Sequence, residues 1–140
     1  MKKSSLFKIM AIGLLAVITS CGGSDPPGTI FIPDFTATWP VDGEEGYFMN
    51  LQYPDDPKYD DGPVQSGAIL GEEQHEDDDD PRHFNILKGN FNGLDIEFTI
   101  ERENGDKITY NGKMTPISET NHFIVKIELH SSEGNVVLSR

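Results

Sequence analysis

The chain has 140 residues, of which 24 are acidic and 11 are Lys or Arg, so its formal net charge at pH 7 is −13. A chain of this length forms one domain and buries roughly two thirds of its unfolded surface. Sixteen of the acids lie between Cys21 and Pro81, where Lys58 is the only base. This charge excludes nucleic acid as a partner, because its phosphates would repel the domain.

The first 20 residues have the pattern of a secretory signal peptide. Lys2, Lys3 and Lys8 make a basic start, and the ten residues 9–18 are apolar. Ten helical residues span roughly 15 Å, about half the apolar core of a bilayer, so this segment is too short for a transmembrane helix. We expect residues 1–20 to be removed.

The residues around the cleavage region, Ile18-Thr19-Ser20-Cys21, resemble a bacterial lipobox. The resemblance implies a diacylglyceryl thioether on Cys21, cleavage before it and acylation of the new amino group. Several acyl chains on one residue hold a protein permanently at a membrane. Cys21 is the only cysteine, so no disulfide supports the domain. The alternative is an ordinary secretory signal followed by a chance cysteine.

A spacer rich in Gly and Pro follows at residues 22–28, and the single folded domain is expected to span residues 29–140. In the enteric sorting rule, an Asp directly after the lipidated cysteine retains a lipoprotein in the inner membrane, and this chain has Gly22 there. The resemblance therefore implies a lipid-anchored protein of the cell envelope, at the outer membrane of a Gram-negative bacterium.

From Thr29 onward, apolar side chains recur at every second residue, which is typical of strands with one buried face. In the first half of the domain this pattern covers residues 35–41 and 47–53, and a loop at 54–63 precedes a shorter strand at 64–70. Residues 72–80 hold seven acids in nine positions, and their self-repulsion predicts a solvated loop.

The second half of the domain alternates most regularly, and predicts strands at residues 83–91, 94–101, 107–114, 123–130 and 136–140. Asn92-Gly93 and Asn104-Gly105 favour the tight turns of β-hairpins. Strands that follow one another through such turns form an antiparallel up-and-down meander. We therefore predict an all-β fold of about eight strands, closed into a barrel, with a β-sandwich as the alternative.

Two residues resemble the closing pair of the lipocalin and avidin group, the calycins. That group begins its first strand with Gly-x-Trp and has an Arg near the end of its last strand. Here Ala37-Thr38-Trp39 starts the first strand, with Ala in place of Gly, and Arg140 ends the chain. The resemblance implies a lipocalin-like barrel in which Arg140 packs across the indole of Trp39 and closes one end.

The interior of the barrel is the main candidate for a binding site. An eight-stranded barrel is either filled by its own side chains or holds one small ligand. The bulky inward positions would line that ligand, and the tyrosines among them need partners for their hydroxyls. These candidates are Tyr47, Met49, Leu51, Tyr53, Phe98, Tyr110, Met114 and Phe123.

No catalytic set is visible in the sequence. The thiol of Cys21 is taken by the lipid, and the serines lack the surroundings of an activated nucleophile. There is no Gly-rich loop that would hold a phosphate before a helix. We therefore expect no enzymatic activity and no cofactor.

A calcium site is the one metal site that composition suggests. Asp77, Asp78, Asp79 and Asp80 form a run of carboxylates, the ligands that this hard cation prefers. The run lacks the spaced ligand pattern of the calcium-binding helix-loop-helix motif, and consecutive aspartates cannot all turn inward. A solvated acidic loop is the alternative.

Two functional hypotheses remain. In the first, a lipid-anchored, lipocalin-like barrel binds a small apolar or amphipathic ligand without catalysis. In the second, the barrel is filled, and the acidic segments 55–62 and 72–80 bind a basic partner protein or calcium. The sequence identifies no particular protein partner.

Overall fold

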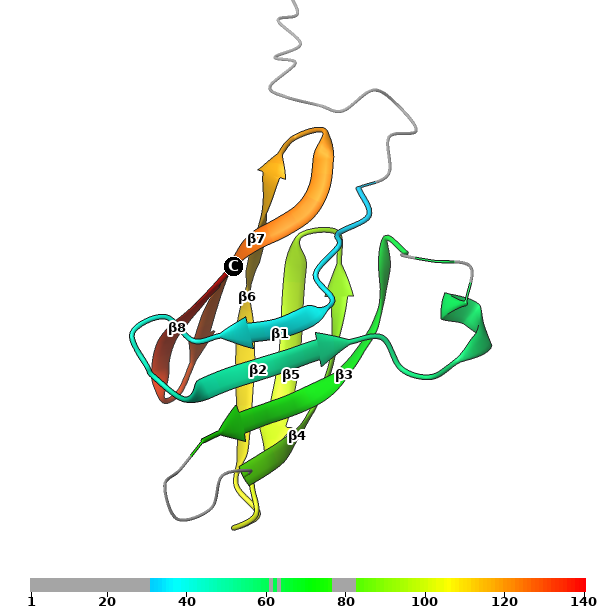
Figure 1. Cartoon of the computed structure of the whole chain (residues 1–140). Coiled ribbons are helices and arrows are strands. Elements are labelled where there is room, and N and C mark those ends of the chain that lie inside the picture. The colour runs from blue at the N-terminus through cyan, green and yellow to red at the C-terminus, as the bar shows by residue number, and fades with distance from the viewer. Residues whose placement is uncertain (1–30, 61, 63, 77–82) are drawn as a thin grey trace, which may run out of the picture.

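The domain is one antiparallel sheet of eight strands in which every strand pairs with the next along the chain. A computed structural model describes residues 31–60, 62, 64–76 and 83–140. The only helix among them is a single 3-10 turn, η1, at Pro57–Tyr59. The predicted all-β, up-and-down fold is thus confirmed (Figure 1). The strands are β1 Ala37–Pro40, β2 Tyr47–Gln52, β3 Ser66–His75, β4 His83–Asn92, β5 Asp95–Glu101, β6 Lys107–Ser118, β7 Asn121–Ser131 and β8 Gly134–Ser139.

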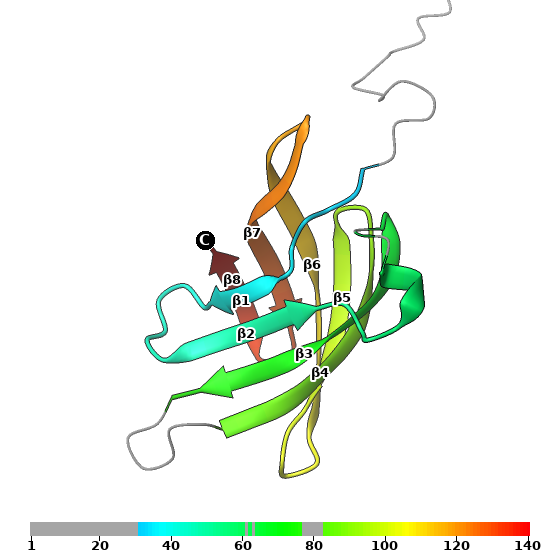
Figure 2. The same ribbon diagram turned by 45° about the vertical axis from the view of Figure 1, so that its right-hand side comes forward.

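The sheet curls until its first and last strands meet. Val41, directly after β1, forms a bridge with Leu138 of β8, and the Asp42 amide donates to the Val137 carbonyl at 2.8 Å. In both views, β8 lies next to β1 (Figures 1 and 2). All eight strands belong to one nearly closed barrel, consistent with a lipocalin-like fold, so the alternative of a two-sheet sandwich is wrong.

The core lies inside the barrel, where the alternating positions of the strands converge. Along β5, Ile96, Phe98 and Ile100 are buried, whereas the charged residues Asp95, Glu97 and Glu101 are exposed. The middle of the barrel is filled by side chains that are 0–2 % exposed: Trp39, Met49, Leu51, Ile69, Leu87, Phe98, Ile100, Tyr110, Met114, Ile127, Leu129 and Leu138. Burial of this apolar set supplies the main stabilisation, since no disulfide is available.

The acidic stretch at residues 72–80 was predicted as a loop, and for its first four residues this is wrong. Strand β3 continues to His75, and Glu73 pairs in register with Met49 on one side and Asn85 on the other. Pairing of β3 with both neighbours outweighs the repulsion between its carboxylates. The candidate calcium ligands Asp77–Asp80 lie outside the described residues.

The residues at the start of β7 that face the interior also differ from the expectation. Phe123 was predicted to face inward, but it is 39 % exposed, and Ile124 is buried in its place. The cause is a β-bulge: Thr115 pairs with Lys126 and Pro116 with Ile124, which leaves Val125 without a paired residue in β6. One extra residue in a strand moves every side chain beyond it to the opposite face.

At two inward-facing glycines, the backbones of neighbouring strands approach each other closely. A Cβ on Gly71 would lie 1.8 Å from the Asn50 carbonyl oxygen, and one on Gly89 would lie 2.0 Å from that of Glu97. Strands approach this closely where a sheet bends sharply, and only glycine fits there. These positions therefore help the sheet to close.

Candidate functional site

One end of the barrel is closed by Arg140. Its guanidinium lies between two rings, with Cζ 4.4 Å from the ring centre of Trp39 and 4.0 Å from that of Phe123. It also donates from Nε to the Ile124 carbonyl at 2.7 Å and from a terminal nitrogen to the Asp34 carbonyl at 2.8 Å. The structure therefore brings Trp39 and Arg140 together, and the β7 bulge places Phe123 against the guanidinium. We call this the closed end.

The opposite end, which we call the open end, contains a pocket of about 370 Å³. Three turns meet there, because the β1–β2 turn supplies Glu44, the β5–β6 turn supplies Arg102 and the β7–β8 turn supplies Glu133. Residues of β2, β3, β6 and β8 form the rest of the lining. The lining residues are Glu44, Tyr47, His75, Arg102, Tyr110, Glu133, Gly134, Asn135 and Val136.

A fully buried carboxylate, that of Glu73, lies behind the lining of this pocket, where it contacts the lining residues Tyr47, His75 and Arg102. Its Oε2 accepts from the Tyr47 hydroxyl at 2.5 Å, and its Oε1 accepts from the Asn85 side-chain amide at 2.8 Å. Arg102 donates to both oxygens at 3.3–3.4 Å and pairs on its other side with Glu133. A buried charge needs such partners, since water cannot solvate it.

These contacts shift the pKa values of the buried groups in opposite directions. Burial alone would raise the pKa of Glu73, but hydrogen bonds from Tyr47, Arg102 and Asn85 outweigh it and lower that pKa below 4.5. For Tyr47, burial and the hydrogen bond to the Glu73 carboxylate raise the pKa of the phenol far above its usual value. Glu73 is therefore ionised at neutral pH and Tyr47 is not.

Aromatic rings form one wall of the open-end pocket. The His75 ring stacks on Tyr47 with centroids 4.2 Å apart and planes at 12°, and His75 Nε2 lies 3.6 Å from Glu73 Oε1. The ring centre of Tyr110 lies 5.5 Å from that of Phe98 in the core. The pocket thus has a stacked pair of rings beside charged groups that are held in place.

The predicted ligand-contacting residues divide between four locations. Tyr47 and Tyr110 line the open-end pocket. Met49, Leu51, Phe98 and Met114 are buried in the filled middle of the barrel. Tyr53 stacks on Tyr59 of η1, with ring centres 5.2 Å apart, and Phe123 belongs to the closed end. The structure therefore does not bring these eight residues together as one lining.

Sequence reasoning missed Glu73, Asn85 and Arg102. A signal for Glu73 exists in the sequence, because Glu73 continues the every-second-residue pattern of Ile69 and Gly71, which face the interior of the barrel. The high acid content of residues 72–80 concealed this alternation. Asn85 and Arg102 offer no comparable signal, since each becomes recognisable only once Glu73 is placed between them.

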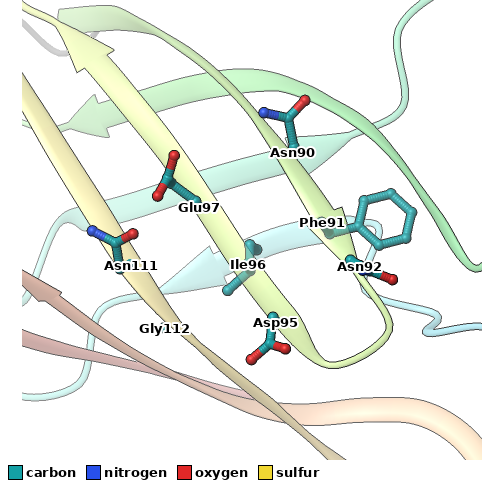
Figure 3. A pocket seen from close by; sticks show the side chains of 8 residues that line it. All are labelled: Asn90, Phe91, Asn92, Asp95, Ile96, Glu97, Asn111 and Gly112. Atoms are coloured by element: carbon teal, nitrogen blue, oxygen red, sulfur yellow. The ribbon is translucent and has the colours of Figure 1, made fainter.

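A second hollow, of about 350 Å³, lies on the outer wall of the barrel. Figure 3 shows Asn90, Asn92, Asp95, Glu97 and Asn111 around it, from β4, β5 and β6. These five side chains are all exposed, and Asp95 pairs with Lys113 beside the hollow. The two hollows are similar in volume, but only the open-end pocket adjoins a buried, ionised group, which is why it is the stronger candidate.

Comparison with known proteins gives no assignment: no family model matches the chain, and no curated protein or solved structure is significantly similar to it. Among the described residues, no group of three or more His, Cys, Asp or Glu side chains is placed to hold a metal ion. In the same part of the chain, no helix is long and apolar enough to cross a membrane. Cys21 lies outside the described residues, so its lipidation remains a prediction.

Proposed function

We propose that the protein is a lipid-anchored, non-enzymatic binding protein of the bacterial cell envelope. Its barrel would hold a small amphipathic ligand in the open-end pocket. The observation that carries this proposal is the buried Glu73 carboxylate, fixed by Tyr47, Asn85 and Arg102 behind the lining of a 370 Å³ pocket that includes aromatic residues. A concave site with apolar faces and a few fixed polar groups is the usual form of a small-molecule site.

The packing of the barrel limits how deeply this ligand enters. Met49, Phe98 and Met114, which the sequence suggested as ligand contacts, are 0–2 % exposed and pack against one another in the core. Side chains with so little accessible surface border no cavity that could hold a guest molecule. The ligand would therefore sit at the mouth, above Tyr47 and Tyr110.

The lipid anchor is supported by the sequence alone. Cys21 follows Ile18-Thr19-Ser20, and residues 22–28 provide a spacer before the domain. Acyl chains on Cys21 would keep the barrel at a membrane surface, where it could collect ligand from the surrounding water.

Titration with three amphiphiles that share an eight-carbon chain tests the binding function. The probes are octylammonium, octyl glucoside and octanoate, and the protein is the chain from residue 21 onward with Cys21→Ser, so that no lipid is attached. It contains every strand and the whole described core. We expect at least one probe to shift the backbone amide resonances of Tyr47, His75 and Glu133. No shift with any probe, or shifts only around the hollow of Figure 3, would contradict the proposal.

Filling each hollow with an indole gives a matched pair of variants. Val136→Trp places a large side chain in the open-end pocket, and Asn111→Trp places one in the outer hollow. Probe binding should be lost in Val136→Trp and kept in Asn111→Trp, with thermal unfolding used to verify that both fold. Equal binding by both variants would count against the open end.

A further inference from the structure

We propose that the open-end pocket selects ligands with a positively charged head group, such as an alkylammonium. This inference rests on the binding function proposed above and adds the chemical class of the ligand. It follows from the charges, the rings and the hydrogen bonds of the pocket.

Carboxylates outnumber bases in and beneath the pocket. Glu44 and Glu133 line it, the buried Glu73 lies behind the lining, and Arg102 is the one lysine or arginine in the lining. Arg102 is already shared between Glu73 and Glu133. Glu44 forms no ion pair with any of the described residues, so its carboxylate is available to an incoming cation. The pocket therefore keeps an excess of negative charge that a cationic head group would reduce.

The rings of the pocket suit the same head group. An ammonium within about 6 Å of an aromatic face is attracted to it, more strongly where water is excluded. Tyr47 and Tyr110 border the pocket with only 7 % and 2 % of their surface exposed, and His75, whose side chain is 43 % exposed, covers one face of Tyr47. Because the Tyr47 hydroxyl donates to Glu73, that ring is held in a fixed orientation. A charged amine at the mouth would thus meet carboxylates chiefly, with a small area of ring surface beside them.

An anionic head group has no comparable partner. It would need the guanidinium of Arg102, whose Nε and one terminal nitrogen bond Glu73 while the other terminal nitrogen bonds Glu133. To bind there it would have to displace Glu133 and remain close to Glu44. Both steps oppose binding, because a displaced acceptor loses its partner and like charges repel.

The surroundings of the mouth extend this preference to longer range. Glu45 in the β1–β2 turn and Glu76, whose amide donates to the Gly46 carbonyl in that turn, are exposed at the same end of the barrel. A rim of one charge sign raises the local concentration of ligands of the opposite sign, and salt weakens this effect.

Calorimetric titration of the Cys21→Ser chain with octylammonium, octyl glucoside and octanoate, at low and physiological salt, tests the inference. We expect octylammonium to bind at least about tenfold more tightly than octanoate, which corresponds to about 1.4 kcal/mol. Octanoate binding as tightly as octylammonium, or more tightly, would overturn the inference and leave the binding function intact. Failure of all three probes to bind would overturn the binding function itself.

Two matched substitutions assign the preference to the pocket. Glu44→Gln removes a carboxylate of the lining without breaking a described ion pair, and Glu119→Gln removes an exposed one in the β6–β7 turn at the other end. Glu44→Gln should weaken octylammonium binding about threefold to tenfold and leave octyl glucoside unchanged, whereas Glu119→Gln should change neither. Equal weakening by the two variants would show a general effect of net charge and overturn the assignment.

Discussion

Glu73 shows how much a single residue can determine in this barrel. Its side chain has no exposed surface, yet it carries a full charge and joins β2, β3, β4 and the β5–β6 turn through Tyr47, Asn85 and Arg102. Such a charge stabilises a fold only while its partners remain, because desolvation of an ion is costly. The same contacts fix lining residues of the proposed binding site, so stability and ligand binding depend on one group.

Replacing this carboxylate by an amide should destabilise the protein in a manner that depends on pH. Glu73→Gln should lower the free energy of unfolding at pH 7 by about 3 kcal/mol, since Arg102 loses its buried partner. The pKa of Glu73 is lowered in the folded state, so its contribution is complete above the unfolded value near 4.5 and is lost as the pH falls below it. Urea unfolding at pH 7 and pH 3 measures both effects.

The neighbouring Glu72→Gln, on the outward face of β3, is the control for this experiment. It should change the free energy of unfolding by less than about 0.5 kcal/mol at either pH. The difference in the free energy of unfolding between wild type and Glu73→Gln should be smaller at pH 3 than at pH 7. An equal difference at both pH values would mean that the charge of Glu73 does not stabilise the cluster.

At the scale of elements, predictability depends on how strictly apolar and polar residues alternate. Strand β5 was predictable because only one phase of Asp95–Glu101 buries Ile96, Phe98 and Ile100. Strand β7 was predicted in the wrong phase at its start, because Phe123, Ile124 and Val125 are all apolar and either phase would bury an apolar residue. The bulge at Val125 decides between the phases, and it forms through pairing with β6, which no local pattern reveals.

The bulge also supplies two of the backbone carbonyl groups that accept hydrogen bonds from Arg140 at the closed end. The carbonyl of Ile124 accepts from the Arg140 side chain, and that of Val125 accepts from the Arg140 backbone amide at 3.1 Å. Arg140→Gln should lower the free energy of unfolding by about 3 kcal/mol, because two charge-assisted hydrogen bonds and the contacts with two rings are lost. Lys113→Gln, which removes an exposed ion pair on the barrel wall, should cost less than about 1 kcal/mol. Thermal and urea unfolding measure both, and equal losses would contradict a special role for Arg140.

Strand β4 has Gly89 where its backbone approaches that of β5 most closely. In Gly89→Ala, the new methyl group would lie 2.0 Å from the Glu97 carbonyl oxygen and 2.4 Å from Phe98 Cα. Both atoms belong to the backbone of β5, so the clash could be relieved only by moving the strand. We expect a loss of about 3 kcal/mol in the free energy of unfolding. Lys88→Ala, at an exposed position of the same strand, should change it by less than about 0.5 kcal/mol. A stable Gly89→Ala protein would show that the strands can separate there without cost.

At the scale of the whole molecule, the up-and-down order was predictable and the place of the site was not. Turn residues such as Asn104-Gly105 join successive strands, so the order follows from the sequence. The pocket depends on contacts between the turns of different hairpins, such as Arg102 with Glu133, which lie 31 residues apart. No spacing rule relates such positions.

The proposed anchor makes a prediction for the complete protein. When the chain is expressed with its leader in a Gram-negative host, wild type should fractionate with membranes and carry acyl mass on Cys21, whereas Cys21→Ala should be soluble or remain unprocessed. Fractionation and intact-mass spectrometry measure this. A mature wild-type protein with an unmodified thiol would contradict lipidation.

The segment that precedes β1 joins the barrel at its closed end, where Asp34 pairs with β7 and Phe31 packs on His122. Glu44 and Glu133 lie at the other end. With lipid on Cys21, the bilayer would be on the Asp34 side, and the mouth would point toward the aqueous compartment. Cargo would then have to arrive dissolved in water rather than by lateral diffusion from the leaflet, which favours short-chain, soluble amines over long-chain lipids.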